Sequence, residues 1–319
     1  ISGFVSLNDG KSYCIQERNE EEYSVINAYD YVSGAKTKEI INAKDVFRGQ
    51  KIDFDDYHYN TDQSIILLYY NSKAIYRHST VGDFRVFDLK GNIQMGKGEG
   101  VRYPTLSPLG DKVAYVLGNN LFIKDIQTEK IIQVTTDGKK NHIINGASDW
   151  VYEEEFALVR SFEWAPDGEH IAYYKFNESG VKEFSMDLFK GGLYPTQEVF
   201  KYPKAGEDNS IVKVYFYNLG SDKNTYIYTE KDYEYFPRIK WTNNPKILAI
   251  YGMNRHQNEL DFVLANAEEG TNRVLFTEKD KYFIDVHDNL TFLPQDNFIW
   301  TSEKDGFNHI YLKGLDGSE

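Results

Sequence analysis

Cysteine and long apolar runs are scarce in this 319-residue sequence, and each scarcity argues against a class of protein. Cys14 is the single cysteine, so no internal disulfide can form and no Cys-x-x-Cys metal site exists. The longest strongly apolar stretch, residues 65–70, is far shorter than the roughly 20 residues that a membrane-spanning helix needs. The sequence therefore predicts neither a disulfide-rich scaffold nor a transmembrane helix.

Positive charge is also in short supply. Lys and Arg number 36 against 49 Asp and Glu, which gives a formal net charge of -13. Proteins that bind nucleic acid need clustered Lys and Arg to displace counterions from phosphates, and no such cluster stands out. We therefore expect no nucleic acid partner, whereas an acidic surface suits cationic ligands.

The aromatic content points to strands. Tyr (25) and Phe (20) are abundant, whereas Met (3) and Pro (8) are few. Flat aromatic side chains suit a pleated, half-buried surface, and a chain of this length with 41% hydrophobic residues can bury a large core. An all-β fold is the first expectation.

A repeated unit makes this expectation more specific. A turn rich in Pro, Asp, Asn and Gly precedes an apolar strand, most clearly in residues 107–116 and 165–174. Further copies of this turn lie near residues 8–10, 61–62, 243–245 and 294–296. The spacing is about 50 residues, with one longer interval of about 77 between Asp167 and Asn244. Four short strands per roughly 40–50 residues are typical of a propeller blade, although a β-sandwich or two tandem barrels is the alternative.

The repeats predict a β-propeller of four-stranded blades that is incomplete. They account for about five to six blades, and the last begins near Pro294, shortly before the sequence ends at Glu319. An unclosed propeller would expose two sheet edges, which invite aggregation. We therefore expect residues 1–319 to be a truncated propeller and part of a longer chain.

One segment, Asp149-Trp-Val-Tyr-Glu-Glu-Glu-Phe156, breaks the strand-turn rhythm with three adjacent carboxylates between aromatic residues. One explanation is a solvated charge run on a short helical turn. The other is a cation site, because carboxylates held close together accept strong charge-assisted hydrogen bonds from an ammonium. The α-amino group of a peptide fits such a site, since it is mostly protonated below a pH of about 7.7–8.0.

Three segments of the sequence resemble segments of one known family and occur in the same order as in that family. Asp149-Trp-Val-Tyr-Glu-Glu-Glu155 resembles the double-glutamate motif in the propeller of the dipeptidyl peptidase IV family. Tyr76-Arg-His-Ser79 resembles the family's segment with a substrate-contacting arginine. Tyr202-Pro-Lys-Ala-Gly-Glu207, followed by Ile211-Val-Lys-Val214, resembles a further family signature. The resemblance is best from about residue 69 to 214 and becomes vague after residue 242.

The resemblance implies a fold, an activity and site residues. In the family the propeller, of seven or eight blades, caps an α/β-hydrolase domain with a Ser-His-Asp triad, and N-terminal dipeptides, preferably X-Pro or X-Ala, are released from peptides. By resemblance, Glu154 and Glu155 bind the α-ammonium of a peptide substrate, and Arg77 binds the carbonyl oxygen of its first residue. Glu153 is expected to be structural or exposed. Phe156 follows Glu155 directly, unlike the mammalian pattern, so no role is carried over beyond Glu155.

Catalysis itself is expected outside this sequence. No Gly-x-Ser-x-Gly elbow occurs, so we expect no catalytic residue here and an inactive fragment, with the C-terminal α/β-hydrolase domain as its partner. No cofactor or metal is expected. The family also implies a homodimer in the periplasm or outside the cell, with a membrane anchor at a missing N-terminus as one variant.

Two other functions remain open. A prolyl tripeptidyl aminopeptidase has a related propeller whose clamp lies one residue further from the nucleophile, so product length separates the two. A non-catalytic interaction propeller would lack the serine in the missing domain. The presence of Glu154, Glu155 and Arg77 argues against it, because a dead relative need not keep an ammonium clamp.

Overall fold

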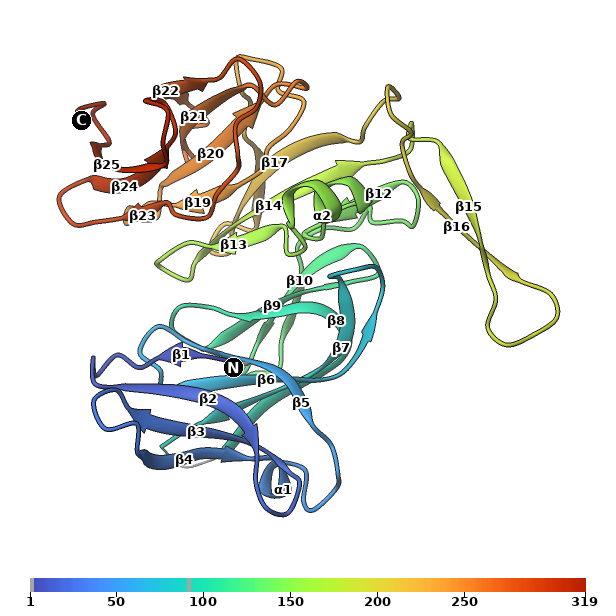
Figure 1. The fold of residues 1–319 in the computed structure, drawn as a ribbon, viewed down its shortest axis with the longest axis vertical. Coiled ribbons are helices and arrows are strands. Elements are labelled where there is room, and N and C mark those ends of the chain that lie inside the picture. Colours follow the sequence, from blue (N-terminus) through green and yellow to red (C-terminus); the bar gives the residue numbers. More distant parts are fainter. Residues whose placement is uncertain (1–2, 91–92) are drawn as a thin grey trace. The chain divides into compact units, whose positions relative to one another are not determined.

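A computed structural model describes residues 3–90 and 93–319, and almost every regular element in it is a β-strand (Figure 1). The chain divides into two compact units, Ile1–Leu117 with Leu121–Gln133 and Gly118–Asn120 with Val134–Glu319. Among the described residues, no helix is both long enough and apolar enough to cross a membrane. The all-β prediction is therefore confirmed.

The first unit is a series of antiparallel strands in sequence order. They are β1 (Val5–Ser6), β2 (Ser12–Arg18), β3 (Ser24–Asp30), β4 (Lys36–Asn42), β5 (Phe54–Tyr59), β6 (Ile65–Ala74), β7 (Thr80–Asp88), β8 (Ile93–Leu106), β9 (Lys112–Leu117), β10 (Asn120–Asp125) and β11 (Ile131–Gln133), with helix α1 (Ala43–Val46) after β4. Strands β1–β4 form one sheet, and β5–β11 form a second. The early part of β8 pairs with β7 and its end pairs with β9, so two four-stranded blades share this long strand.

Strand β6 shows why the apolar run of residues 65–70 is a strand buried on both faces. Ile66, Leu68 and Tyr70 belong to a core shared with the sheet β1–β4, whereas Leu67 and Tyr69 belong to a core shared with β8–β10. Successive side chains of a strand point to opposite faces, so a strand covered on both sides reads as a continuous apolar run. The blade is thus packed between its two neighbours.

The second unit continues the same pattern. Its elements are β12 (Ile143–Asn145), α2 (Trp150–Phe156), β13 (Phe162–Trp164), β14 (His170–Asn177), β15 (Glu183–Leu188), β16 (Thr196–Lys201), β17 (Ile211–Asn218), β18 (Lys223–Tyr226), β19 (Ile239–Trp241), β20 (Ile247–Met253), β21 (Glu259–Asn266), β22 (Asn272–Lys279), β23 (Thr291–Phe292), β24 (Asn297–Ser302) and β25 (His309–Gly314). Sheets form around β14, from β19–β22 and from β23–β25. Phe262 of β21 lies 5.2 Å from Phe298 and 5.5 Å from Trp300 of β24, measured between ring centroids, so the last two sheets pack face to face.

All six predicted repeat turns lie at the same place, between the first and second strands of a blade. Gly110 and Gly168 have φ angles of 80° and 68° there, which glycine adopts without steric cost. The blades therefore begin one strand before the turns that mark them in the sequence. The long interval after Asp167 arises because the hairpin β15–β16 is inserted between β14 and β17.

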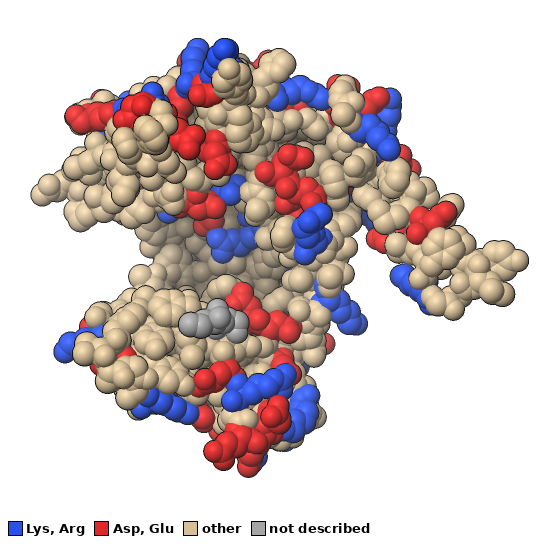
Figure 2. Space-filling view, in the orientation of Figure 1, with Lys and Arg blue, Asp and Glu red and all other residues tan. Residues whose placement is uncertain are grey.

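The inserted hairpin projects from the sheet that carries it (Figure 1). Its tip exposes large apolar side chains, with Phe189 at 70%, Leu193 at 95% and Tyr194 at 86%. Figure 2 shows few charged side chains at this tip. Contiguous exposed apolar surface of this kind often marks a site of protein association.

Candidate functional site

The acidic segment is an insertion in the first strand position of the sheet around β14. Strands β12 and β13 pair with successive parts of β14, so residues 146–161 leave and rejoin one strand position. The base of this excursion is closed by a bridge between Ala147 and Arg160 and by a 3.0 Å hydrogen bond from the Ser161 amide to the Gly146 carbonyl. A rigid sheet therefore holds both ends of the insertion.

Helix α2 occupies the middle of the insertion, as the helical-turn explanation predicted. Asp149 is its N-cap and accepts a 3.0 Å hydrogen bond from the Tyr152 amide. The helix ends at Ala157, whose φ of 49° is left-handed, and the Leu158 amide donates to the Tyr152 carbonyl over 3.1 Å. A helix this short is not stable alone, so its neighbours must hold it.

Burial divides the helix into an anchored face and an open face. Tyr152 and Phe156, one helical turn apart, are buried, and so is Glu153, which is 1% exposed. Glu154 is half-buried and Glu155 is exposed. Of the two expectations for Glu153, structural or exposed, the structure shows a buried residue. Glu154 and Glu155, which were predicted to bind the substrate, are the accessible glutamates of the helix.

Tyr152 is the main anchor of the helix. Its hydroxyl oxygen accepts a 2.8 Å hydrogen bond from the Phe236 amide. Its ring lies 4.9 Å from Phe176 and 5.2 Å from Phe156. Burial raises the pKa of Tyr152 well above its usual value, so its hydroxyl stays neutral. The helix is therefore tied both to its own sheet and to the segment that enters the next one.

A distant segment, residues 202–210, supports the start of the helix. The Ser210 hydroxyl donates a 2.6 Å hydrogen bond to Asp149, and the Tyr202 ring lies 4.2 Å from the Trp150 ring. Burial raises the pKa of Asp149, although Ser210 and the Tyr152 amide oppose that shift. The sequence singled out residues 202–207 as a family signature, but no local pattern could pair Asp149 with a residue 61 positions away.

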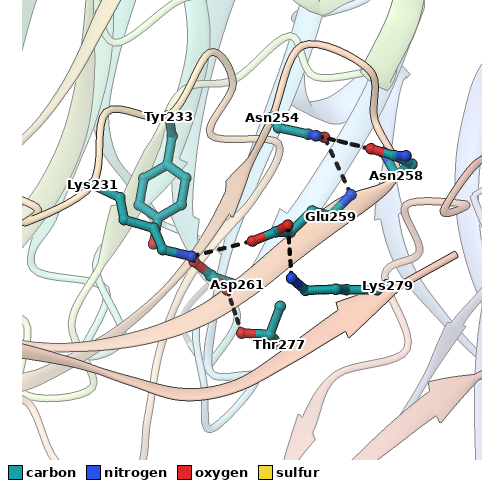
Figure 3. Close-up of polar contacts among 8 residues, drawn as sticks. All are labelled: Lys231, Tyr233, Asn254, Asn258, Glu259, Asp261, Thr277 and Lys279. Atoms are coloured by element: carbon teal, nitrogen blue, oxygen red, sulfur yellow. Dashed lines mark hydrogen bonds and ion pairs between the residues drawn. The ribbon is translucent and has the colours of Figure 1, made fainter.

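The segment before β19 is fixed by a buried carboxylate (Figure 3). Asp261 of β21 is 1% exposed and accepts hydrogen bonds from Lys231 at 2.6 Å and from Tyr233 at 2.7 Å. Both donors lie a few residues before Phe236. The cluster therefore fixes the segment whose backbone holds the Tyr152 hydroxyl.

The open face of α2 carries two carboxylates, those of Glu154 and Glu155. The pKa of Tyr235 is raised mainly by burial, and the negative charges of Glu234 and Glu155 add to this rise. Two neighbouring carboxylates on an anchored helix can accept several hydrogen bonds from one ammonium. Across the described part of the chain, no three His, Cys, Asp or Glu side chains cluster closely enough to hold a metal ion.

Arg77 lies in the first unit, on the bend between β6 and β7, where it is exposed. Ser79 shapes this bend, because its carbonyl accepts from the Ile75 amide at 2.8 Å and its hydroxyl from the Tyr76 amide at 3.2 Å. Glu154 and Glu155 lie in the second unit. The roles of all three side chains stay predictions.

Comparisons with known proteins identify the fold. The model of the dipeptidyl peptidase IV (DPP IV) N-terminal region matches residues 60–319. The crystal structure of Porphyromonas gingivalis dipeptidyl peptidase 4 superposes with a TM-score of 0.89 at 34% identity, covering 99% of this chain and 45% of that one. This match confirms the predicted propeller fold.

Curated relatives agree. A probable dipeptidyl peptidase 4 of Arthroderma benhamiae is 30% identical over 285 residues, which are 83% of this chain and 36% of the relative. A probable dipeptidyl-aminopeptidase B of Uncinocarpus reesii is 29% identical over 288 residues, 80% of this chain and 31% of the relative. The chain thus spans about a third of the length of these relatives. It belongs to the dipeptidyl peptidase IV family and corresponds to the family's N-terminal region.

Proposed function

We propose that this chain is the substrate-gating, N-terminus-binding propeller of a serine exopeptidase that releases N-terminal dipeptides, preferably X-Pro or X-Ala. In this proposal Glu154 and Glu155 bind the α-ammonium of the peptide. The observation that carries it is the anchored acidic helix, which buries Glu153 and leaves the next two carboxylates accessible. The names of the relatives support the reaction class.

The physical argument concerns both affinity and distance. An ammonium has three donors, and hydrogen bonds between charged partners are roughly twice as strong as neutral ones. A clamp at a fixed distance from a nucleophile leaves room for two residues, so a longer N-terminal extension would clash. Orienting the substrate through atoms remote from the scissile bond raises the rate of the chemical step.

Arg77 has a separate part in the proposal, as the donor to the carbonyl oxygen of the first substrate residue. Its guanidinium is permanently charged and presents a rigid fork of donors, whereas lysine offers a flexible point charge. We therefore expect Arg77→Lys to lower kcat/KM for a dipeptide substrate by about tenfold or more, since hydrogen bonds to charged groups contribute about 1.5–3 kcal/mol. An unchanged kcat/KM would remove Arg77 from the site.

The rest of the enzyme is also proposed. A C-terminal α/β-hydrolase domain would supply the Ser-His-Asp triad, so this chain alone would be inactive and would need no cofactor. The greater length of the relatives supports this division. We further propose a homodimer in the periplasm or outside the cell, and the exposed apolar tip of the hairpin β15–β16 supports the dimer.

The test uses a full-length protein that includes this sequence. Hydrolysis of Gly-Pro-nitroanilide, its N-acetylated form and a tripeptide nitroanilide is compared in wild type and Glu154→Gln/Glu155→Gln. The matched control is Glu268→Gln/Glu269→Gln, another adjacent pair of glutamates, both of which are exposed. We expect the wild type to cut only the free-amine dipeptide. Its kcat/KM should fall by about 100-fold or more in Glu154→Gln/Glu155→Gln and stay unchanged in the control.

Each alternative predicts a different result. Release of a tripeptide from a free-amine substrate would identify a prolyl tripeptidyl aminopeptidase. No hydrolysis of any substrate would favour a non-catalytic interaction propeller. Equal cleavage of free and acetylated dipeptides, unaffected by the double substitution, would show that Glu154 and Glu155 do not bind the ammonium.

A further inference from the structure

We propose that Arg255 is a positioning residue for the acidic helix α2. It lies in the turn between β20 and β21, and it fixes the segment 202–210 that supports the start of the helix. The inference rests on the proposed function, because its consequence for the enzyme is the placement of Glu154 and Glu155.

The guanidinium of Arg255 joins two segments of the second unit. One nitrogen, Nη2, donates to the carbonyl oxygen of Glu207 over 2.5 Å. The other, Nη1, donates to Oε1 of Glu234 over 3.1 Å. Glu207 belongs to the segment before β17, and Glu234 to the segment before β19. The guanidinium presents its donors in a rigid planar fork, so it holds both acceptors in one defined geometry.

The link continues from these segments to both ends of the helix. Asn209 donates to Glu234 at 2.7 Å and to the Tyr235 hydroxyl at 3.0 Å. The next residue, Ser210, holds the N-cap carboxylate. Tyr235 packs against Phe156 at the end of the helix, with ring centroids 5.3 Å apart. A shift of these segments would therefore move the helix that carries the glutamates.

The surroundings explain why such a tie is needed. Residues 202–210 form no helix or strand. A cavity of about 500 Å³ adjoins them and is lined by Asn209, Ser210, Glu234, Phe236 and Arg255, among other residues. Since dense packing does not confine the segment on this side, directional polar contacts must set its position.

The effect should be local. The side chains of Arg255 and Glu234 are 42% and 29% exposed, and ion pairs at such exposure contribute little to the free energy of unfolding. Loss of Arg255 should therefore misplace the helix without unfolding the propeller. A displacement of about 1 Å at a substrate clamp can lower the rate substantially.

The experiment compares Arg255→Ala with Arg18→Ala in a full-length protein that includes this sequence. Arg18 is a matched control, because it also bonds one carboxylate, Asp53 at 2.6 Å, and one backbone carbonyl, that of Glu22 at 3.1 Å. Three quantities are measured: kcat/KM for Gly-Pro-nitroanilide, hydrogen exchange of amides 149–158, and the melting temperature. For Arg255→Ala we expect about tenfold lower kcat/KM, faster exchange in this segment and an almost unchanged melting temperature. Arg18→Ala should change none of them.

A double-mutant comparison separates positioning from a general structural effect. In the Glu154→Gln/Glu155→Gln background, Arg255→Ala should lower kcat/KM no further, because residues that act through the same contacts are not additive. An additive loss would overturn the inference. Unchanged exchange in residues 149–158 would overturn it as well, whatever the enzyme does. A third outcome is faster exchange in Arg255→Ala combined with normal amine recognition in Glu154→Gln/Glu155→Gln. It would support the role of Arg255 in positioning the helix and would refute the proposed function instead.

Discussion

The N-cap of the acidic helix gives the sharpest test of how this site is built. Asp149→Ala removes the cap, which typically costs about 1 kcal/mol. It also deprives the buried Ser210 hydroxyl of its partner, which costs about a further 1–3 kcal/mol. We therefore expect the free energy of local opening of α2 to fall by about 2–4 kcal/mol.

Asp149→Asn separates the hydrogen bonds from the charge. Asparagine caps helices about as well as aspartate, and its amide can donate to the Ser210 hydroxyl, so the loss should stay below about 1 kcal/mol. Burial raises the pKa of Asp149, so the folded state holds this proton more tightly than the unfolded state does. The wild type should lose stability as the pH rises through the window above the unfolded value of about 3.9, and the asparagine variant should not. The stability of the asparagine variant relative to that of the wild type should therefore increase from pH 4 to 7.

Hydrogen exchange of the amides of residues 150–158 measures the opening directly. Asp30→Ala is the control, because Asp30 also accepts from a backbone amide and a serine hydroxyl, both of Ser33 at 2.8 Å, but at an exposed turn. It should leave exchange in α2 unchanged. Equal losses in the alanine and asparagine variants of Asp149, or no loss in either, would refute the cap reasoning.

Two further predictions concern the sheet β19–β22. Burial tends to raise the pKa of Asp261, but hydrogen bonds from neighbours including Lys231 outweigh it and hold that pKa below its usual value. Asp261→Asn should lower the free energy of unfolding by about 1–3 kcal/mol at pH 7. The wild type should lose this advantage over the variant as the pH falls below about 3.9, because the Asp261 carboxylate then becomes protonated. Urea unfolding at several pH values tests this, and parallel pH profiles would contradict it. Phe262→Ala, at a fully buried ring between two sheets, should cost about 3–5 kcal/mol in the same assay, whereas Phe307→Ala, at an exposed ring, should stay within about 0.5 kcal/mol. Similar losses in both would argue against the packing seen between these sheets.

Much of the fold was readable from the sequence because its signals are local. The turn glycines Gly110 and Gly168 mark the first hairpin of their blades, since left-handed backbone favours glycine wherever it occurs. The apolar run of residues 65–70 follows one of the repeat turns, so a strand was expected there, whereas its burial on both faces was found only in the structure. The family motif that ends in Glu154 and Glu155 was likewise visible as a short, chemically unusual string.

What the sequence could not give depends on which strands become neighbours. Residues 146–161 interrupt one strand position, which is visible only from the pairing of β12 and β13 with β14. The long repeat interval arises from the hairpin β15–β16, which is inserted into one blade. The hydrogen bond from Ser210 to Asp149 and that from Arg255 to Glu207 join segments that are far apart in the sequence. The burial of Glu153 likewise depends on its surroundings in the folded chain. The sequence by itself determined the blades and the acidic motif. Only the tertiary structure decided which carboxylates face outward and what holds them, because those contacts exist only once separate sheets have packed.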